Sequence, residues 1–125
     1  MIICLINPNT TRKMTDNIEI AAKNVASSGT KIIATNPKNG PVSIEGYYDE
    51  VFCIPGIIEE VNSNNEADAY IIACFDDTGL DAVRSITKKP VLGIGDSSFH
   101  IASCLAGNFS VITTLEVSVP ILKNN

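Results

Sequence analysis

The fold of this chain is decided by the stretch Ala69-Tyr-Ile-Ile-Ala-Cys-Phe-Asp-Asp-Thr-Gly-Leu-Asp81. Tyr70 to Ala73 is a short apolar run with β-branched residues, which is typical of a strand covered on both faces. Asp77 and Thr78 are residue types that cap helices, so a helix is predicted to begin directly after this strand. Cys74 is therefore expected at the junction between a buried strand and the head of a helix.

Opposing effects at this junction act on the pKa of the Cys74 thiol. Unpaired backbone N–H groups and the positive end of a helix dipole favour the thiolate. Nearby carboxylates of Asp76 and Asp77 favour the thiol, so the sign of the net shift stays open. Two interpretations of Cys74 also stay open: a reactive thiol, or a small buried apolar residue, which is the commoner fate of a cytosolic cysteine.

Strand, loop and helix alternate on both sides of this stretch. The other runs with strand character are Ile2 to Ile6, Lys31 to Thr35, Val91 to Ile94 and Phe109 to Thr113. Helical spacing is found at Met14 to Val25, Tyr47 to Ile54, Pro55 to Val61, Leu80 to Ile86, Ile101 to Leu105 and Val117 to Leu122. Repeated strand–helix units predict an α/β fold, a parallel sheet with helices on both faces. We predict a flavodoxin-like, three-layer arrangement with strand order 2-1-3-4.

The expected ligand site lies where this strand order reverses, beyond the carboxyl ends of the first and third strands. Asn7-Pro-Asn-Thr10 and Cys74-Phe-Asp-Asp-Thr78 meet there, with Pro41 to Glu45 and Gly95 to Ser97 at the sides. Helix starts at Thr10 and Thr78 would direct free N–H groups at a carboxylate, or at a carbonyl that gains negative charge. The predicted ligand is a small anionic or enolate-like molecule.

Composition excludes several classes of function. With 125 residues, 45% of them hydrophobic, the chain can bury one core of ordinary domain size. A formal charge of −5 gives no basic face for phosphates, so nucleic acid is not an expected partner. No apolar run spans a membrane and Met1 leads directly into a strand, so we expect a cytoplasmic protein. Four scattered cysteines and one histidine predict neither a disulfide framework nor a metal site.

Five segments carry a resemblance that covers the chain in order and spacing. They are Ile6-Asn-Pro-Asn-Thr10 with Met14-Thr15, Gly40-Pro-Val-Ser-Ile-Glu45, Ala73 to Asp81, Pro90-Val-Leu-Gly-Ile-Gly95 and Phe109-Ser-Val-Ile-Thr-Thr114. Together they resemble the Asp/Glu/hydantoin racemase family, and within it the hydantoin and allantoin racemases. Amino-acid racemases of the wider group usually carry Cys-Asn-Thr where this chain has Cys74-Phe-Asp76. This difference favours a cyclic ureide such as a hydantoin as the substrate.

The resemblance implies cofactor-independent racemisation by two cysteines. One cysteine removes the proton beside the substrate carbonyl, the other returns a proton to the opposite face, and Cys74 matches the first. The residues that the resemblance places at the substrate are Asn7, Asn9, Ser43, Ile44, Phe75, Asp76, Thr78 and Thr113. For each polar residue among them, a role in a turn or a helix cap is an equally good interpretation.

The resemblance also predicts how the chain is divided. Family members have two similar α/β lobes with the substrate between them, and their second cysteine lies in a Gly-Cys motif of the later lobe that this sequence lacks. We expect residues 1–108 to form the N-terminal lobe and residues 109–125 to hold the first strand and helix start of a truncated second lobe. Such a chain is expected to be inactive alone. The alternatives are a non-catalytic domain that binds a small anion, an Asp/Glu racemase, or a fragment that forms a homo-oligomer through an exposed apolar face.

Overall fold

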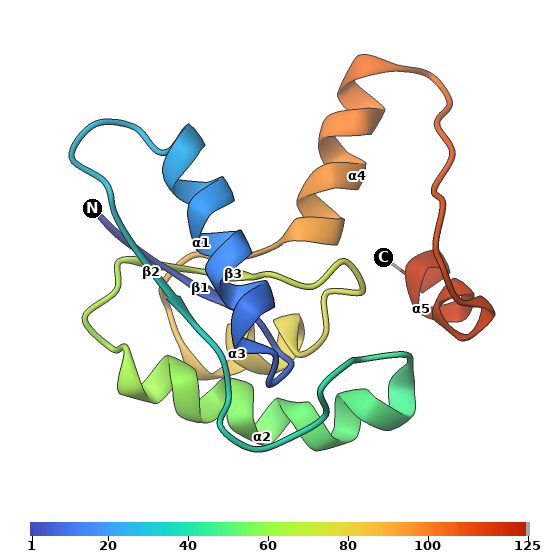
Figure 1. Cartoon of the computed structure of the whole chain (residues 1–125). Helices are drawn as coiled ribbons and strands as arrows, with labels where there is room; N and C mark the ends of the chain where they lie inside the picture. The colour runs from blue at the N-terminus through green and yellow to red at the C-terminus, as the bar shows by residue number, and fades with distance from the viewer. Residues whose placement is uncertain (125) are drawn as a thin grey trace.

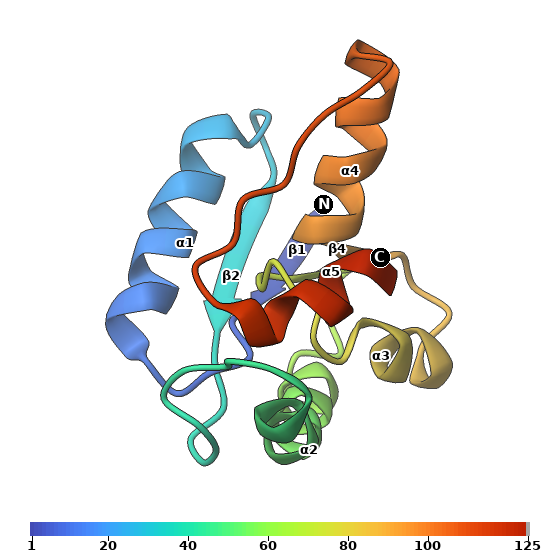
Figure 2. The same cartoon turned by 90° about the vertical axis from the view of Figure 1, so that its right-hand side faces the viewer.

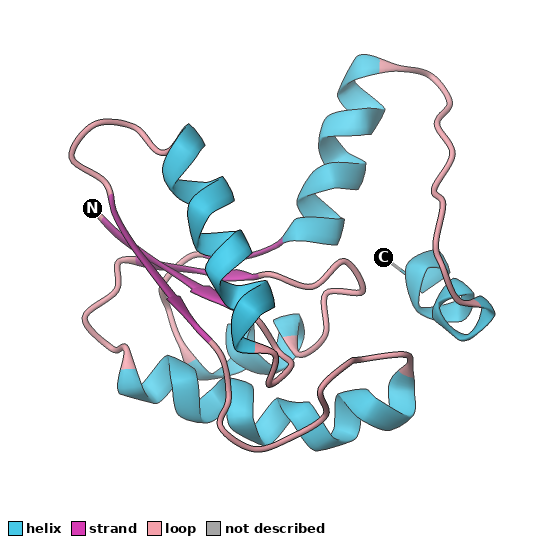
Figure 3. Cartoon of the chain, viewed as in Figure 1, coloured by secondary structure: helices cyan, strands magenta, loops and turns pink. Residues whose placement is uncertain are grey.

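The computed structural model describes residues 1–124, which form a parallel sheet between two layers of helices (Figure 1, Figure 3). The elements in chain order are β1 (Ile2–Ile6), α1 (Arg12–Val25), β2 (Lys31–Thr35), α2 (Tyr47–Ser63), β3 (Ala69–Ile72), α3 (Leu80–Ile86), β4 (Val91–Gly93), α4 (Ile94–Leu105), the 3-10 helix η1 (Glu116–Ser118) and α5 (Val119–Asn124). Within this part of the chain, no helix is both long and apolar enough to cross a membrane.

The sheet has the predicted strand order. Its four strands are parallel and lie in the order β2-β1-β3-β4. β1 pairs with both β2 and β3, so its carboxyl end and that of β3 lie side by side. Helix α1 lies on one face of the sheet, α4 projects from the end of β4 on the same side, and α2 and α3 cover the other face (Figure 1). The predicted α/β class and the point where the strand order reverses are therefore confirmed.

The main core lies between the sheet and the layer of α2 and α3. Alternate residues of the central strands point into it, as the two-residue period of a strand requires. Its fully or almost fully buried side chains are Cys4, Ile6, Cys53, Ile57, Val61, Ala67, Tyr70, Ile72, Leu80, Val83 and Val91. This core holds the carboxyl ends of β1 and β3 in fixed positions, and the loops of the site start from these ends.

Helix α2 is continuous, and the prediction of two helices that meet at Pro55 was wrong. Pro55 lies inside Tyr47–Ser63. Proline removes one backbone hydrogen bond from a helix interior. Cys53, Ile57 and Val61, on both sides of the proline, are buried along one stripe of the helix. Packing of this stripe on the core holds the helix together across the missing bond.

Phe109 to Thr113 was predicted as a strand, and this was wrong. The segment is extended, but it leaves the far end of α4 and reaches η1 without joining the sheet (Figure 1, Figure 2). A strand needs a neighbour for its backbone N–H and C=O groups, and among residues 1–124 no strand lies beside this segment. Ile112 is 92% exposed. The division of the chain at residues 108 and 109, and self-association through such apolar side chains, stay predictions.

Candidate functional site

Cys74 lies in the loop that leaves the carboxyl end of β3. The strand ends at Ile72, and the backbone N–H of Asp77 donates to the carbonyl of Cys74 at 3.1 Å. The Cys74 side chain is partly buried and packs against the core. Its Sγ shares a hydrogen bond with the hydroxyl of Thr78 at 3.6 Å, and Thr78 is only 2% exposed. The thiol therefore lies at the carboxyl edge of the sheet, where Thr78 of the same loop holds it by a hydrogen bond.

The pKa of Cys74 is raised. The direction of this shift, which the sequence left open, is therefore upward. Burial is the largest cause and disfavours the thiolate. Hydrogen bonds from the Thr78 hydroxyl and from the N–H groups of Asp76 and Thr78 oppose this rise, and the negative charge of Asp76 adds to it. Because the pKa is raised, Cys74 is a protonated thiol at neutral pH.

The other three cysteines lie in different environments. Cys4 and Cys53 are completely buried, and burial raises the pKa of each thiol to about 12. Cys104 is exposed on α4. Among the four cysteines, only Cys74 combines partial exposure with a place on a loop at the carboxyl edge of the sheet.

The first loop is held together by its own asparagine side chains. Asn7, which is 1% exposed, donates from Nδ2 to Asn9 Oδ1 at 2.9 Å and to Thr15 Oγ1 at 3.1 Å. Asn9 Oδ1 also accepts from the backbone N–H of Thr11 at 2.9 Å. Helix α1 begins at Arg12, so the predicted helix start at Thr10 was two residues early. These bonds correspond to the turn role of Asn7 and Asn9, and their contact with a substrate stays a prediction.

The loop from Pro41 to Glu45 lies against the first loop, as expected. The backbone N–H of Thr10 donates to Pro41 O at 3.0 Å, and the hydroxyl of Thr11 donates to Val42 O at 2.7 Å. Ser43 is exposed, whereas Ile44 is partly buried against the core. Of the two predicted pocket residues, the structure thus leaves Ser43 accessible and gives Ile44 a packing role.

The C-terminal segment is tied to the Cys74 loop by polar and aromatic contacts. The hydroxyl of Ser118 in η1 donates to Asp76 Oδ2 at 3.1 Å. Phe75 packs edge-on against Phe99 with ring centroids 5.5 Å apart, and Phe99 stacks on Phe109 at 6.1 Å. Ser118 was not predicted, because a lone serine between two valines carries no signal of a contact 42 residues away.

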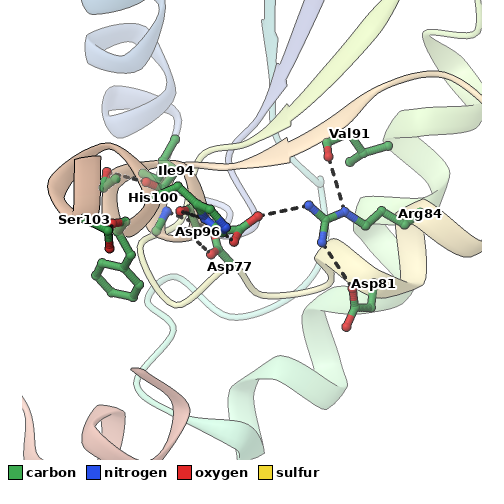
Figure 4. Close-up of polar contacts among 11 residues, drawn as sticks. Asp77, Asp81, Arg84, Val91, Ile94, Asp96, His100 and Ser103 are labelled. Carbon is green, nitrogen blue, oxygen red and sulfur yellow. Dashed lines mark hydrogen bonds and ion pairs between the residues drawn. The ribbon is translucent and has the colours of Figure 1, made fainter. Parts of the chain in front are cut away.

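Asp77 caps a different helix from the one predicted. Its Oδ1 accepts from the N–H of Gly95 at 3.0 Å and its Oδ2 accepts from the N–H of Asp96 at 2.5 Å, in the first turn of α4 (Figure 4). Helix α3 begins later, at Leu80, and follows Gly79. Burial raises the pKa of Asp77, while the two N–H groups oppose the rise. Asp77 and Thr78 were both predicted to cap α3; instead Asp77 contacts α4 and Thr78 contacts the thiol.

Comparisons with known proteins place this chain in a family. The family model for Asp/Glu/Hydantoin racemase matches residues 3–125. The chain belongs to this family. It is 56% identical over 117 residues to a hydantoin racemase of Pseudomonas sp. (strain NS671), and the match covers 92% of this chain and 47% of that protein. With a hydantoin racemase of Rhizobium meliloti the identity is 44% over 126 residues, covering 99% of this chain and 52% of that protein.

Solved structures of the racemase family have the same fold as this chain. It superposes on an allantoin racemase from Klebsiella pneumoniae with a TM-score of 0.95 and 40% identity, over 99% of this chain and 51% of that one. An allantoin racemase from Pseudomonas fluorescens gives a TM-score of 0.94 and 30% identity, over 99% of this chain and 53% of that one. The chain thus spans about half the length of the racemases that it matches.

The chain also has a cleft of about 500 Å³ that lies beside the Cys74 loop. Side chains of α2, α3 and α5 line this cleft together with Asp76 and Asp77, but Cys74 is not among them. Thr113, the last predicted pocket residue, is partly buried in the extended segment between α4 and η1. Among residues 1–124, no three His, Cys, Asp or Glu side chains are grouped so that they could hold a metal ion.

Thr78→Val is expected to raise the pKa of Cys74 further. Valine keeps the shape of threonine but removes the hydroxyl, whose hydrogen bond is the largest influence that lowers this pKa. The pKa can be measured from the pH dependence of alkylation at Cys74, followed by peptide mass, with the exposed Cys104 as an internal reference. Thr30→Val, in the turn before β2, is the matched control. An unchanged or lowered Cys74 pKa in Thr78→Val would contradict the assigned bond.

Proposed function

We propose that this chain is part of a racemase for 5-substituted hydantoins or allantoin, in which Cys74 transfers the proton beside the ring carbonyl without a cofactor. The observation that carries the proposal is the position of the Cys74 thiol, on a loop at the carboxyl edge of the sheet where the strand order reverses. The named relatives support it, since the matched proteins are called hydantoin racemases and the solved structures allantoin racemases. Hydantoins and allantoin share a ring in which a carbon bearing hydrogen is bonded to a carbonyl.

The proposed chemistry uses both protonation states of the thiol. In one direction a thiolate at Cys74 takes the proton from the ring carbon, and the electron pair of the broken C–H bond moves onto the carbonyl oxygen as an enolate. In the other direction the neutral thiol gives its proton to the ring carbon. The raised pKa of Cys74 suits the second role directly, and it makes the thiolate a stronger base once this has formed.

Racemisation needs a second acid–base group on the opposite face of the ring. We infer that this chain supplies one such group only. Cys4 and Cys53 are buried in the core, and Cys104 lies on the exposed side of α4. The second cysteine would belong to the half of the family's length that this chain does not span. Without it, we propose that the chain does not racemise a substrate.

The proposed substrate contacts come from the loops around Cys74. Asp76 and Thr78 lie on the Cys74 loop, and Phe75 places an aromatic ring, 39% exposed, next to the thiol in sequence. The full proposed set, beside the catalytic Cys74, is Asn7, Asn9, Ser43, Ile44, Phe75, Asp76, Thr78 and Thr113. An aromatic ring beside the thiol suits a flat, uncharged ureide ring better than it suits the charged head of an amino acid.

Proton NMR of an enantiopure 5-substituted hydantoin in D₂O, with optical rotation followed in parallel, tests this function. We expect the ring proton to exchange with solvent above the buffer rate while the rotation is kept, because one thiol removes and returns the proton on the same face. L-aspartate under the same conditions is expected to show no exchange. Exchange of aspartate in place of the hydantoin, or no exchange of either, would contradict the proposed substrate class. Loss of rotation would contradict the inference that only one acid–base group is present.

A further inference from the structure

The carboxylate of Asp77 joins the Cys74 loop to helix α4. Asp77 is 7% exposed, and its two oxygens accept the backbone N–H groups of Gly95 and Asp96 at 3.0 and 2.5 Å (Figure 4). Unbonded N–H groups at the start of a helix favour a negative side chain. Helix α4 has 12 residues, so its first turn offers a full set of such groups. One buried side chain thus connects two elements that are 18 residues apart in the chain.

The backbone around this contact is shaped to let the carboxylate approach. A Cβ atom at Gly93 would lie 2.1 Å from Asp77 Oδ1, and a Cβ atom at Gly95 would lie 2.2 Å from the carbonyl oxygen of Phe75. Both distances are far below a van der Waals contact, so only glycine fits at these two positions. The loop and the first turn of α4 are therefore packed backbone against backbone around Asp77.

The backbone N–H and C=O groups of Asp77 also form hydrogen bonds within its own loop. Its N–H donates to Cys74 O at 3.1 Å, and its carbonyl accepts from the N–H of Leu80 at 2.9 Å. Its backbone is left-handed (φ 53°), and within the described part of the chain no other residue except glycine has positive φ. Such a conformation is strained for a residue with a Cβ and persists when surrounding bonds hold it. Movement of Asp77 would move Cys74 on one side and its neighbour Thr78 on the other.

Charged groups around Asp77 are arranged in pairs. Asp96 faces it and adds a negative charge, but Asp96 itself pairs with Arg84 and with His100 Nδ1, each at 3.1 Å (Figure 4). The positive charge of Arg84 also acts on Asp77 and favours its ionised form. Arg84 further contacts Asp81, at 3.5 Å. The N–H groups of Gly95 and Asp96 donate directly to the Asp77 carboxylate, and the charges of Asp96 and Arg84 act on its pKa in opposite directions, that of Asp96 more strongly.

We infer that Asp77 is a positioning residue for Cys74: its carboxylate fastens the Cys74 loop to the first turn of α4 and so keeps the thiol partly buried beside the Thr78 hydroxyl. The inference rests on the proposed function in so far as Cys74 is the reacting group. Without the carboxylate, the loop loses its attachment to α4 and the thiol gains contact with water. Because burial is the main cause of the raised pKa of Cys74, opening of the loop lowers that pKa toward the ordinary cysteine value.

Alkylation of the thiol tests this inference separately from racemase activity. We compare the rates at Cys74 and Cys104 in the same molecules, by peptide mass, from pH 6 to pH 10 (roughly the range around an ordinary cysteine pKa). Asp77→Asn should raise the Cys74-to-Cys104 rate ratio below pH 8 about threefold for each unit by which the pKa falls, since a tenfold gain in thiolate is partly offset by a weaker nucleophile. This result does not depend on whether the chain exchanges a hydantoin proton.

Two control variants distinguish a loss of positioning from a loss of stability and from the loss of a neighbouring charge. Val83→Ala removes buried side-chain atoms of α3 and lowers stability while the Asp77 carboxylate is kept. Asp96→Asn removes a neighbouring charge but leaves the Asp77 carboxylate on α4. Both should keep the wild-type rate ratio. A ratio that is unchanged or lowered in Asp77→Asn, or that rises equally in Val83→Ala, overturns the inference.

The wild-type chain supplies an independent measurement if Asp77→Asn does not fold. In low concentrations of urea, hydrogen exchange of the Gly95 and Asp96 amides and alkylation of Cys74 should accelerate together, with the same dependence on urea. One opening event would then expose both sides of the contact. Alkylation of Cys74 that accelerates while these two amides stay protected overturns the inference.

Discussion

Cys74→Ser is expected to reduce ring-proton exchange of a 5-substituted hydantoin to the buffer rate. A positioned acid–base group contributes about 10²- to 10⁴-fold to the rate of proton transfer, and a serine hydroxyl ionises too weakly to replace a thiolate. Serine keeps the size of the side chain and can still form a hydrogen bond with Thr78, so the loop should keep its shape. Proton NMR in D₂O, on wild-type and variant chains at equal concentration, measures the loss.

The matched control for this prediction is Cys104→Ser. Cys104 is exposed on α4 and lies outside the Cys74 loop, so its replacement should leave the exchange rate unchanged. Urea unfolding of both variants shows whether each is folded under the conditions of the assay. Exchange that persists in Cys74→Ser, or that disappears in Cys104→Ser, would remove Cys74 from the proposed role.

Local sequence signals predicted the strands of the sheet correctly because, in the folded chain, each of these segments also lies beside another strand with which it pairs. The runs Ile2–Ile6, Lys31–Thr35 and Ala69–Ile72 are apolar and bounded by turn residues, and the first of them pairs with both of the others. Phe109 to Thr113 has the same local signal but lies beside no strand of the described chain. Apolar β-branched sequence gives a tendency to extend, whereas a strand is formed only by pairing.

The errors at the site have a similar origin. Asp77 was recognised as a capping residue, but sequence proximity assigned it to α3, while the folded chain brings the start of α4 to its carboxylate. Thr78 was also expected as a cap, and it contacts Cys74 instead. Pro55 was predicted to begin a new helix, because proline interrupts the hydrogen bonds of a helix interior. Packing of the buried stripe of α2 outweighs this effect. Sequence patterns thus located the loops of the site, while the partners of each side chain depended on contacts between distant segments.

Gly95→Ala is expected to destabilise the chain strongly, although alanine is the better helix former. A methyl group at Gly95 would lie 2.2 Å from the carbonyl oxygen of Phe75 and 2.8 Å from Asp77 Oδ2. The first of these atoms is backbone and cannot turn away. Overpacking and a weakened cap together should cost about 2–4 kcal/mol of unfolding free energy, against a gain of about 1 kcal/mol from helix propensity.

Gly107→Ala is the matched control, because no atom lies within 4 Å of a Cβ built at Gly107. Its effect should stay within about 0.5 kcal/mol, as for most surface substitutions. Urea unfolding followed by circular dichroism gives both values from the shift in midpoint at constant slope. Equal midpoints for the two variants would mean that the Cys74 loop and α4 can separate at little cost. The tight contact between Phe75, Asp77 and Gly95 would then hold neither the loop nor the thiol.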